Sequence, residues 1–312
     1  MRRPRIGLAL GSGAARGWAH VGVIKVLVRA GFKPDLVCGT SIGALVGAAY
    51  AAGELERFEH WLLGLRRKDV LGLMDFGLNG GMLKGDKLVA FFRRNFLDRD
   101  IHALDLPFAA VATGLHTGAE VWLREGSTIE AVRASIALPG LFAPLLRDGL
   151  TLVDGGLVNP VPVSLGRAMG ADLLVAVDLN SDLLGRHRPQ DPPADAAAAA
   201  GWLSDWRRLL PERLRGGGSD PADAPPADAP PAGAQGRSLR MPSSINVMAA
   251  SINIMQVRIS RSRMAGDPPD VTVTPRLGHL GLLDFHRAAE AIEAGERAME
   301  SALPALQALC ED

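Results

Sequence analysis

The sequence predicts an α/β protein built on a mostly parallel sheet. The main observation is that a strand, a glycine-rich turn and a helix follow one another twice before residue 53. The first unit is the apolar run Ile6–Leu10 with a helical pattern over Gly17–Ala30. The second is Asp35–Cys38, then the turn Gly39–Gly43, then a helix over Ala44–Ala52.

Segments farther along the chain extend this pattern. Ser127–Leu138 predicts a helix with Ser127 as N-cap, and Glu130 completes a capping box. Phe285–Leu309 predicts a C-terminal helix. Short apolar runs predict five more strands, at Phe108–Thr113, Ala119–Leu123, Leu150–Val153, Leu173–Leu179 and Val271–Thr274.

Composition limits the classes of function. The 312 residues are 47% hydrophobic, which is ample for a buried core. Lys plus Arg and Asp plus Glu are 34 each, so a dedicated nucleic-acid binder is disfavoured. The two cysteines, Cys38 and Cys310, are too few for a disulfide framework and favour a reducing cytoplasm.

One stretch departs from globular composition. Between Gly216 and Ser238 no apolar residue is larger than Ala, Pro aside, so we predict a disordered insertion at about 189–240 within a single domain of residues 1–312. Inside it, Trp202–Leu214 has helical spacing and predicts a helix packed on the body, or else a docking helix. After it, a stripe at helical spacing predicts a core-facing helix, with Ile245, Met248, Ile252, Met255 and Ile259.

No segment is long and apolar enough to suggest a membrane span. The basic start Met1–Arg5 is followed by only six apolar-leaning residues, Ile6–Gly11, too few for the core of a signal peptide. We therefore expect a cytoplasmic protein.

The strongest chemical motif is the G-x-S-x-G at Gly39–Gly43. It follows a predicted strand and opens a predicted helix, which is the setting of a nucleophile elbow. Glycines at Gly39 and Gly43 allow close backbone approach around Ser41, and the helix N-terminus favours negative charge nearby. The alternative is an ordinary tight turn without chemistry.

A second loop, Gly11–Gly17, also joins a strand to a helix. It is compatible with a dinucleotide cradle or with backbone N–H groups that face an oxyanion. A dinucleotide site needs an acidic residue at the end of the second strand, whereas Asp35 begins that strand. An oxyanion loop beside a nucleophile is therefore the preferred interpretation.

A serine nucleophile needs a base, and Asp154 is the best candidate. It ends an apolar strand and enters the turn of Gly155 and Gly156. A partly buried carboxylate near Ser41 would accept the hydroxyl proton directly. The alternative is a plain hairpin turn. His20 is the histidine nearest in sequence to the loops, and we expect a structural role for it.

Five motifs follow one another along the chain, at Leu8–Val23, Gly39–Gly43, Gly85–Leu88, Ala134–Pro144 and Asp154–Pro160. With these motifs the chain resembles bacterial patatin-like phospholipases related to the catalytic domain of neuropathy target esterase. The resemblance implies a three-layer α/β/α sandwich with a central, mostly parallel sheet, and a lipid acyl hydrolase that uses a Ser–Asp dyad and no cofactor or metal. By match, Ser41 would be the nucleophile and Asp154 the base. The N–H groups of Gly13, Ala14 and Arg16 would form the oxyanion hole.

The oxyanion loop departs from the usual G-G-G-x-R-G of that family, because Ser12 and Ala14 replace glycines. Backbone donors survive these changes provided that Ala14 needs no positive φ. Ser135 and Pro139 are candidates for the wall of the substrate pocket.

Lipid substrates imply an apolar channel with a cover. Gly64–Lys87 is a candidate lid, since it contains several glycines. The helix predicted at Asp86–Leu97 is expected to pack on the core with a solvated basic edge, or else to lie on an anionic membrane.

A phospholipid or lysophospholipid is the expected substrate, with peripheral contact at the inner face of the membrane. Two other functions stay open at this point: a non-catalytic scaffold, and a sensor that binds a nucleotide or phosphate through the Gly11 loop.

Overall fold

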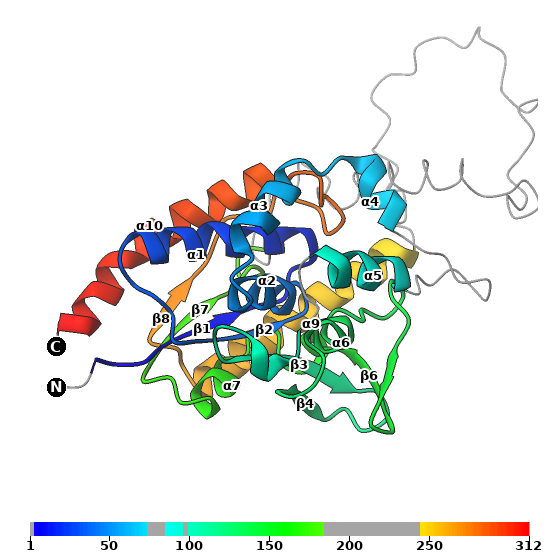
Figure 1. Ribbon diagram of the computed structural model, residues 1–312, viewed down its shortest axis with the longest axis horizontal. Helices are drawn as coiled ribbons and strands as arrows, with labels where there is room; N and C mark the ends of the chain where they lie inside the picture. The colour runs from blue at the N-terminus through cyan, green and yellow to red at the C-terminus, as the bar shows by residue number, and fades with distance from the viewer. Residues whose placement is uncertain (1–2, 74–84, 96–98, 184–243, 312) are drawn as a thin grey trace, which may run out of the picture.

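The computed structural model describes residues 3–73, 85–95, 99–183 and 244–311 (Figure 1). In these ranges the centre is an eight-stranded sheet in the order β5-β6-β3-β2-β1-β7-β8, with β4 pairing with β3. The run from β3 to β8 is parallel, while β4 and β6 pair antiparallel with β3 and β5 pairs antiparallel with β6. The strands are β1 Ile6–Leu10, β2 Leu36–Thr40, β3 Phe108–Gly114, β4 Glu120–Leu123, β5 Leu145–Arg147, β6 Leu150–Asp154, β7 Leu173–Val177 and β8 Val271–Val273.

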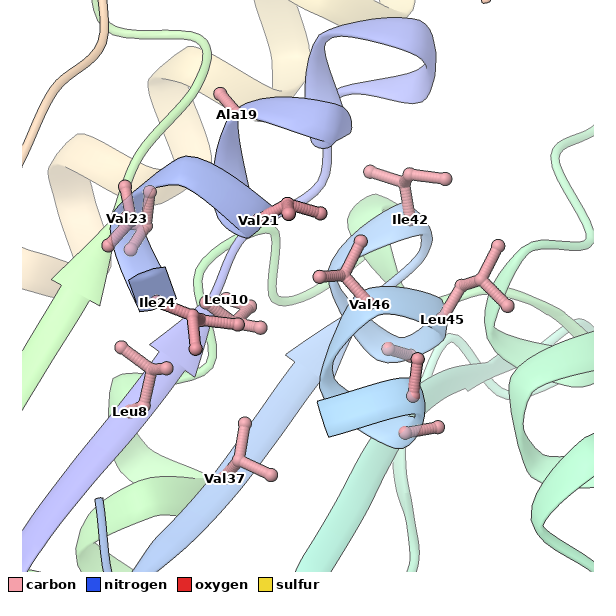
Figure 2. Close-up of a cluster of buried hydrophobic side chains, with 14 of the residues drawn as sticks. Leu8, Leu10, Ala19, Val21, Val23, Ile24, Val37, Ile42, Leu45 and Val46 are labelled. Carbon is pink, nitrogen blue, oxygen red and sulfur yellow. The ribbon is translucent and has the colours of Figure 1, made fainter. Parts of the chain in front are cut away.

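Helices cover both faces of this sheet, because both faces of its strands are apolar. Leu8 and Leu10 of β1 pack under α1 and α2 (Figure 2), whereas Ala9 faces a second cluster with Val163 and Leu165 of α7. The expected three-layer α/β/α sandwich is confirmed. The helices are η1 Ala14–Trp18, α1 Ala19–Arg29, α2 Ile42–Ala51, α3 Leu55–Leu63, α4 Arg67–Leu73, α5 Asp86–Asn95, η2 Ile101–Ala103, α6 Thr128–Ser135, η3 Gly155–Leu157, α7 Val163–Ala168, α9 Ser244–Gly266 and α10 Ala288–Glu311.

The two N-terminal units match the prediction with shifted boundaries. The first strand has the predicted bounds, but a 3-10 turn, η1, precedes α1. Strand β2 runs on to Thr40, so Ser41 follows it directly and becomes the N-cap of α2. This places the G-x-S-x-G turn at the carboxyl edge of the sheet, where ligands bind in open α/β folds.

Other predicted elements need correction. The capped helix α6 ends at Ser135 rather than Leu138, although its N-cap Ser127 Oγ does accept the Glu130 N–H at 3.4 Å. The run expected at Leu173–Leu179 stops at Val177, and α10 starts at Ala288. Sequence analysis did not predict β5 or α7, which are three and six residues long and too short to show a period.

The prediction that the apolar stripe of α9 faces the core is wrong for its two methionines, whereas Ile252 and Ile259 are half-buried. Met248 and Met255 are 40% and 48% exposed, while Asn253 and Gln256 are buried at 7% and 6%. The helix therefore turns Asn253 and Gln256 inward together with Val257, toward loops that offer hydrogen-bonding groups, and leaves Met248 and Met255 outside. The side chain of Ile245 in the predicted stripe lies outside the described part of the structure.

Helix α5 supports the core-packed alternative. Its Phe92 is 2% exposed and packs against Phe58 and Trp61, while Arg93 and Arg94 are exposed. In the described ranges, no helix combines the length and apolarity needed to cross a membrane. The predicted insertion at about 189–240, with its helix at 202–214, and residues 74–84 of the candidate lid lie outside the described residues.

Helices α1 and α10 cross closely because each contributes a glycine. A Cβ on Gly22 would lie 2.0 Å from Ile292 O, and a Cβ on Gly295 would lie 2.0 Å from Ala19 O. Both obstacles are backbone atoms, which no side-chain rotation can remove. Figure 1 shows α1 lying along α10 on one face of the sheet.

We predict that Gly22→Ala destabilises the protein by about 1–3 kcal/mol or more, because the added methyl group forces the two helices apart. The matched control is Gly72→Ala in α4, where a Cβ meets nothing within 4 Å. That variant should be neutral or slightly stabilising. Chemical denaturation of both variants measures the difference, and equal stabilities would contradict the prediction.

Candidate active site

Ser41 sits on a strained turn between β2 and α2, with φ at 57°. Two glycines make this turn possible. A Cβ on Gly39 would lie 2.4 Å from the backbone of Gly43 and Ala44, and one on Gly43 would lie 2.2 Å from Leu10 O. The motif thus forms the sharp elbow that the sequence predicts, with α2 packed tightly on the end of β1.

Asp154, at the end of β6, is hydrogen-bonded to Ser41. Ser41 Oγ donates a hydrogen bond to Asp154 Oδ2 at 2.6 Å, and the Gly156 N–H donates to Oδ1 at 2.7 Å. A Cβ on Gly155 would lie 2.2 Å from Val111 O, so the turn after Asp154 packs directly on β3. The structure therefore brings together the two residues that sequence analysis paired.

Burial sets the acidity of this carboxyl. Asp154 is 1% exposed, and desolvation raises its pKa from 3.8 to about 6, against the hydrogen bonds from Ser41 and Gly156, which lower it. The group is ionised at neutral pH, yet basic enough to accept a proton. This is the property that a general base near Ser41 requires.

Ser135 has a role that sequence analysis did not assign. Its Oγ accepts the Ser41 N–H at 2.8 Å and donates to Val111 O at 2.6 Å. It is fully buried and supports the elbow; it does not line the pocket. Pro139 is also absent from the pocket lining, whereas its neighbours Leu138 and Leu141 belong to it.

The Gly11 loop contains two backbone N–H groups that stay available as donors. In the described part of the chain, the N–H groups of Gly13 and Ala14 have no recorded acceptor, while those of Ser12 and Ala15 bond to Pro160 O and Leu282 O. Ala14 lines the same pocket as Ser41. These two N–H groups fit the predicted oxyanion donors.

Arg16 does not fit that assignment. Its N–H donates to Gly13 O at 3.2 Å, and its guanidinium Nε donates to the same oxygen at 3.2 Å. The expected donor is therefore used to hold the loop. The proviso on Ala14 also fails, because its φ is 49° and the replacement of glycine leaves strain at this position.

The buried His20 is structural, as predicted. Its Nε2 lies 2.8 Å from Gly11 O, and burial lowers its pKa to about 4, so the ring is neutral. This contact holds the end of β1 where the Gly11 loop begins.

An apolar pocket of about 110 Å³ opens at Ser41. It lies between the two loops and helices α2, α3 and α5, and the described residues that line it include no Lys, Arg, Asp or Glu. Leu65 and Val70 bring the described start of the candidate lid to its wall. The lining residues are Ala14, Trp18, Ser41, Ile42, Leu45, Trp61, Leu65, Val70, Phe92, Ile136, Leu138, Leu141, Phe142 and Phe285.

We predict that Ser135→Ala lowers both stability and the reactivity of Ser41. It removes the acceptor of the Ser41 N–H, and an unsatisfied buried donor costs about 1–3 kcal/mol. Thermal melting and the labelling rate of Ser41 by a fluorophosphonate probe measure the two effects. A variant that melts and labels like wild type would show that the elbow does not depend on this hydrogen bond.

Comparison with known proteins agrees with this geometry. The family model for patatin-like phospholipase matches residues 8–166, which contain both loops, Ser41 and Asp154. An uncharacterised NTE family protein of Mycobacterium tuberculosis is 34% identical over 97% of this chain and 92% of its own length. Human patatin-like phospholipase domain-containing protein 6 is 34% identical over 66% of this chain, which corresponds to 15% of that longer protein. Mouse patatin-like phospholipase domain-containing protein 7 shows the same identity over the same share of each chain. The chain belongs to the patatin-like phospholipase family.

Proposed function

We propose that this protein is a serine hydrolase of lipid carboxylic esters, with Ser41 as nucleophile and Asp154 as general base. The observation that carries the proposal is the 2.6 Å hydrogen bond from Ser41 Oγ to Asp154 Oδ2 at the mouth of an apolar pocket. Membership of a lipid hydrolase family supports the same reaction class.

In the first step, Ser41 Oγ attacks the ester carbonyl carbon while its proton passes to Asp154 Oδ2. The carbonyl oxygen becomes an oxyanion and accepts hydrogen bonds from the Gly13 and Ala14 N–H groups. Each such donor is typically worth about 10²–10³ in rate. The protonated Asp154 then gives its proton to the leaving alcohol as the ester C–O bond breaks, which leaves an acyl-serine.

In the second step, water repeats the sequence. The water oxygen attacks the acyl carbon while Asp154 takes a proton from that water. Collapse of the tetrahedral intermediate returns that proton to Ser41 Oγ and releases a fatty acid. The strained elbow keeps Oγ in the same position in both steps, so little reorganisation is needed.

The pocket supports an acyl chain as the group bound next to Ser41. Apolar and aromatic side chains line it, and none of the described residues in its lining is a cation, which disfavours the alternative of a nucleotide or phosphate sensor. The proposed substrates are phospholipids or lysophospholipids whose head group stays outside the pocket. Contact with a membrane surface stays a prediction.

The decisive test is labelling with a fluorophosphonate probe. Wild-type protein should label, and both Ser41→Ala and Asp154→Asn should lose labelling and turnover of lysophospholipids while remaining folded. Detergent or lipid vesicles are included so that restricted access to the pocket does not hide a working site. A well-folded wild type that stays unlabelled under all these conditions would favour the non-catalytic scaffold.

The pKa of Asp154 predicts a pH dependence of activity. Only the ionised carboxylate accepts the proton of Ser41, so kcat/KM should rise with pH and level off above about pH 6. A profile that is flat from pH 5 to 8 would contradict the role of Asp154 as base.

The same pKa predicts the stability of Asp154→Asn. The folded-state pKa of about 6 lies above the ordinary value of 3.8, so the folded protein keeps a proton that the unfolded chain releases in this window. The contribution of this carboxyl to the free energy of unfolding therefore falls as pH rises from about 4 to 6 and stays lower above it. Asparagine cannot ionise, so the variant should melt at an equal or higher temperature at pH 8 and lose that advantage near pH 4. Thermal melts of both proteins across this range measure the difference, and a difference that stays the same from pH 4 to 8 would contradict the raised pKa of Asp154.

A further inference from the structure

Helix α9 contacts the candidate active site through its polar inner face. Asn253 and Gln256 are three residues apart, so they lie one above the other on the same side of the helix. They are 7% and 6% exposed, and neither belongs to the 8–166 stretch that carries the family motifs. Burying two amide side chains at this place calls for partners.

Those partners are the two ends of the segment that carries the oxyanion donors. Ser12 Oγ donates to Gln256 Oε1 at 3.1 Å, and Arg16 Nη2 donates to Asn253 Oδ1 at 3.2 Å. Gly13 and Ala14 lie between these two attachment points. The helix thus fastens the loop on both sides of its free N–H groups.

Gln256 also lies beside the turn that follows Asp154, and it is hydrogen-bonded to Asn180 after β7. Its Nε2 lies 2.5 Å from the point that a Cβ on Gly156 would occupy, and Asp154 Oδ1 lies 2.9 Å from that same point. Its Oε1 accepts a second hydrogen bond, from Asn180 Nδ2 at 3.2 Å, and the Asn180 amide donates to Ser12 O at 3.1 Å. One side chain therefore touches both the oxyanion loop and the turn after Asp154.

We propose that Gln256, with Asn253, is a positioning residue for ester hydrolysis: α9 holds the Gly13 and Ala14 N–H groups in register with Ser41 and Asp154. The proposal rests on the proposed function. We call the two α9 side chains and their hydrogen bonds to the loop the clamp. The clamp is needed because Ala14 is strained: a non-glycine residue with a φ of 49° relaxes unless its surroundings hold it. A misplacement of about 1 Å in such a site costs up to about 10²-fold in rate.

The test uses the full chain and Gln256→Met, which keeps the side-chain length and removes the acceptor. We expect kcat for p-nitrophenyl octanoate to fall about 10–100-fold with KM nearly unchanged, because oxyanion donors act in the transition state. Asn253→Leu removes the other attachment and should act in the same direction. The double variant should cost less than the product of the two single losses, since both hold one loop.

Ser260→Ala is the matched control. Ser260 is on the same face one turn farther along, is 1% exposed, and its hydroxyl makes no recorded hydrogen bond within the described residues. Its kcat should equal that of wild type. A fall in kcat as large as that of Gln256→Met would mean that any change on this face loosens the helix, and would overturn the specific role of Gln256.

A second readout separates positioning from general destabilisation. The inhibitor is an alkyl trifluoromethyl ketone. Ser41 Oγ adds to its carbonyl carbon while the hydroxyl proton passes to Asp154, and the carbonyl oxygen becomes an oxyanion in the proposed hole. Gln256→Met should weaken its binding by the same factor as kcat/KM, and leave binding of the matching secondary alcohol unchanged. Equal affinity of wild type and variant for the ketone, or a rise in KM alone, would overturn the proposal.

The outcomes for wild type keep the two proposals apart. A wild type that hydrolyses the ester and labels at Ser41 supports the proposed function whatever Gln256→Met does. If Gln256→Met fails to fold, Asn253→Leu gives the same measurement from the other attachment point. Full activity in every α9 variant would overturn the clamp and leave the Ser41–Asp154 mechanism intact.

Discussion

The site depends on how closely α2 approaches the end of β1. A Cβ on Gly43 would lie 2.2 Å from Leu10 O, and one on Gly17 would lie 2.2 Å from the Ile42 side chain, so only hydrogen fits at either position. This contact presses the Gly11 loop and the Ser41 elbow together and fixes Ser41 at a φ of 57°. Asp154 reaches the same point because β6 pairs antiparallel with β3, with Asp154 opposite Ala112. Segments far apart in sequence thus converge on one hydroxyl, as they must if a base is to act on it without an intervening group.

The geometry of the site carries local free-energy costs. Positive φ at Ser41 and Ala14 costs about 1–3 kcal/mol each, and the buried carboxyl of Asp154 resists ionisation. Burial of the apolar core on both faces of the sheet offsets these free-energy costs. Specific hydrogen bonds hold the strained segments in place. Ser135 holds the elbow, the Gly156 N–H holds Asp154, and α9 holds the loop around Ala14. Strain is therefore concentrated where the proposed chemistry needs fixed geometry.

The residues that sequence analysis could identify are those marked by their neighbours in sequence. Ser41 directly follows a strand and Asp154 ends one, and each has glycines close by in sequence, so the motif and its neighbours predict their place at the sheet edge. Ser135 gives no such signal, because its partner Ser41 is 94 residues away and a serine at a helix end is common. The N–H of Arg16 was misassigned for a related reason. A loop sequence shows which N–H groups exist, but only the folded loop shows which of them are already bonded to its own carbonyls.

The error on α9 shows the limit of apolar periodicity. The rule that the apolar stripe of a helix faces the core holds when the neighbour is a sheet or another helix. Helix α9 instead packs part of its length on loops, which contain carbonyls, hydroxyls and a guanidinium that need partners inside the protein. Amides at Asn253 and Gln256 satisfy them, and the apolar side chains of Ile254 and Met255 are turned outward. In a protein whose candidate catalytic residues lie on loops, polar residues at helical spacing can therefore indicate where a helix contacts the site.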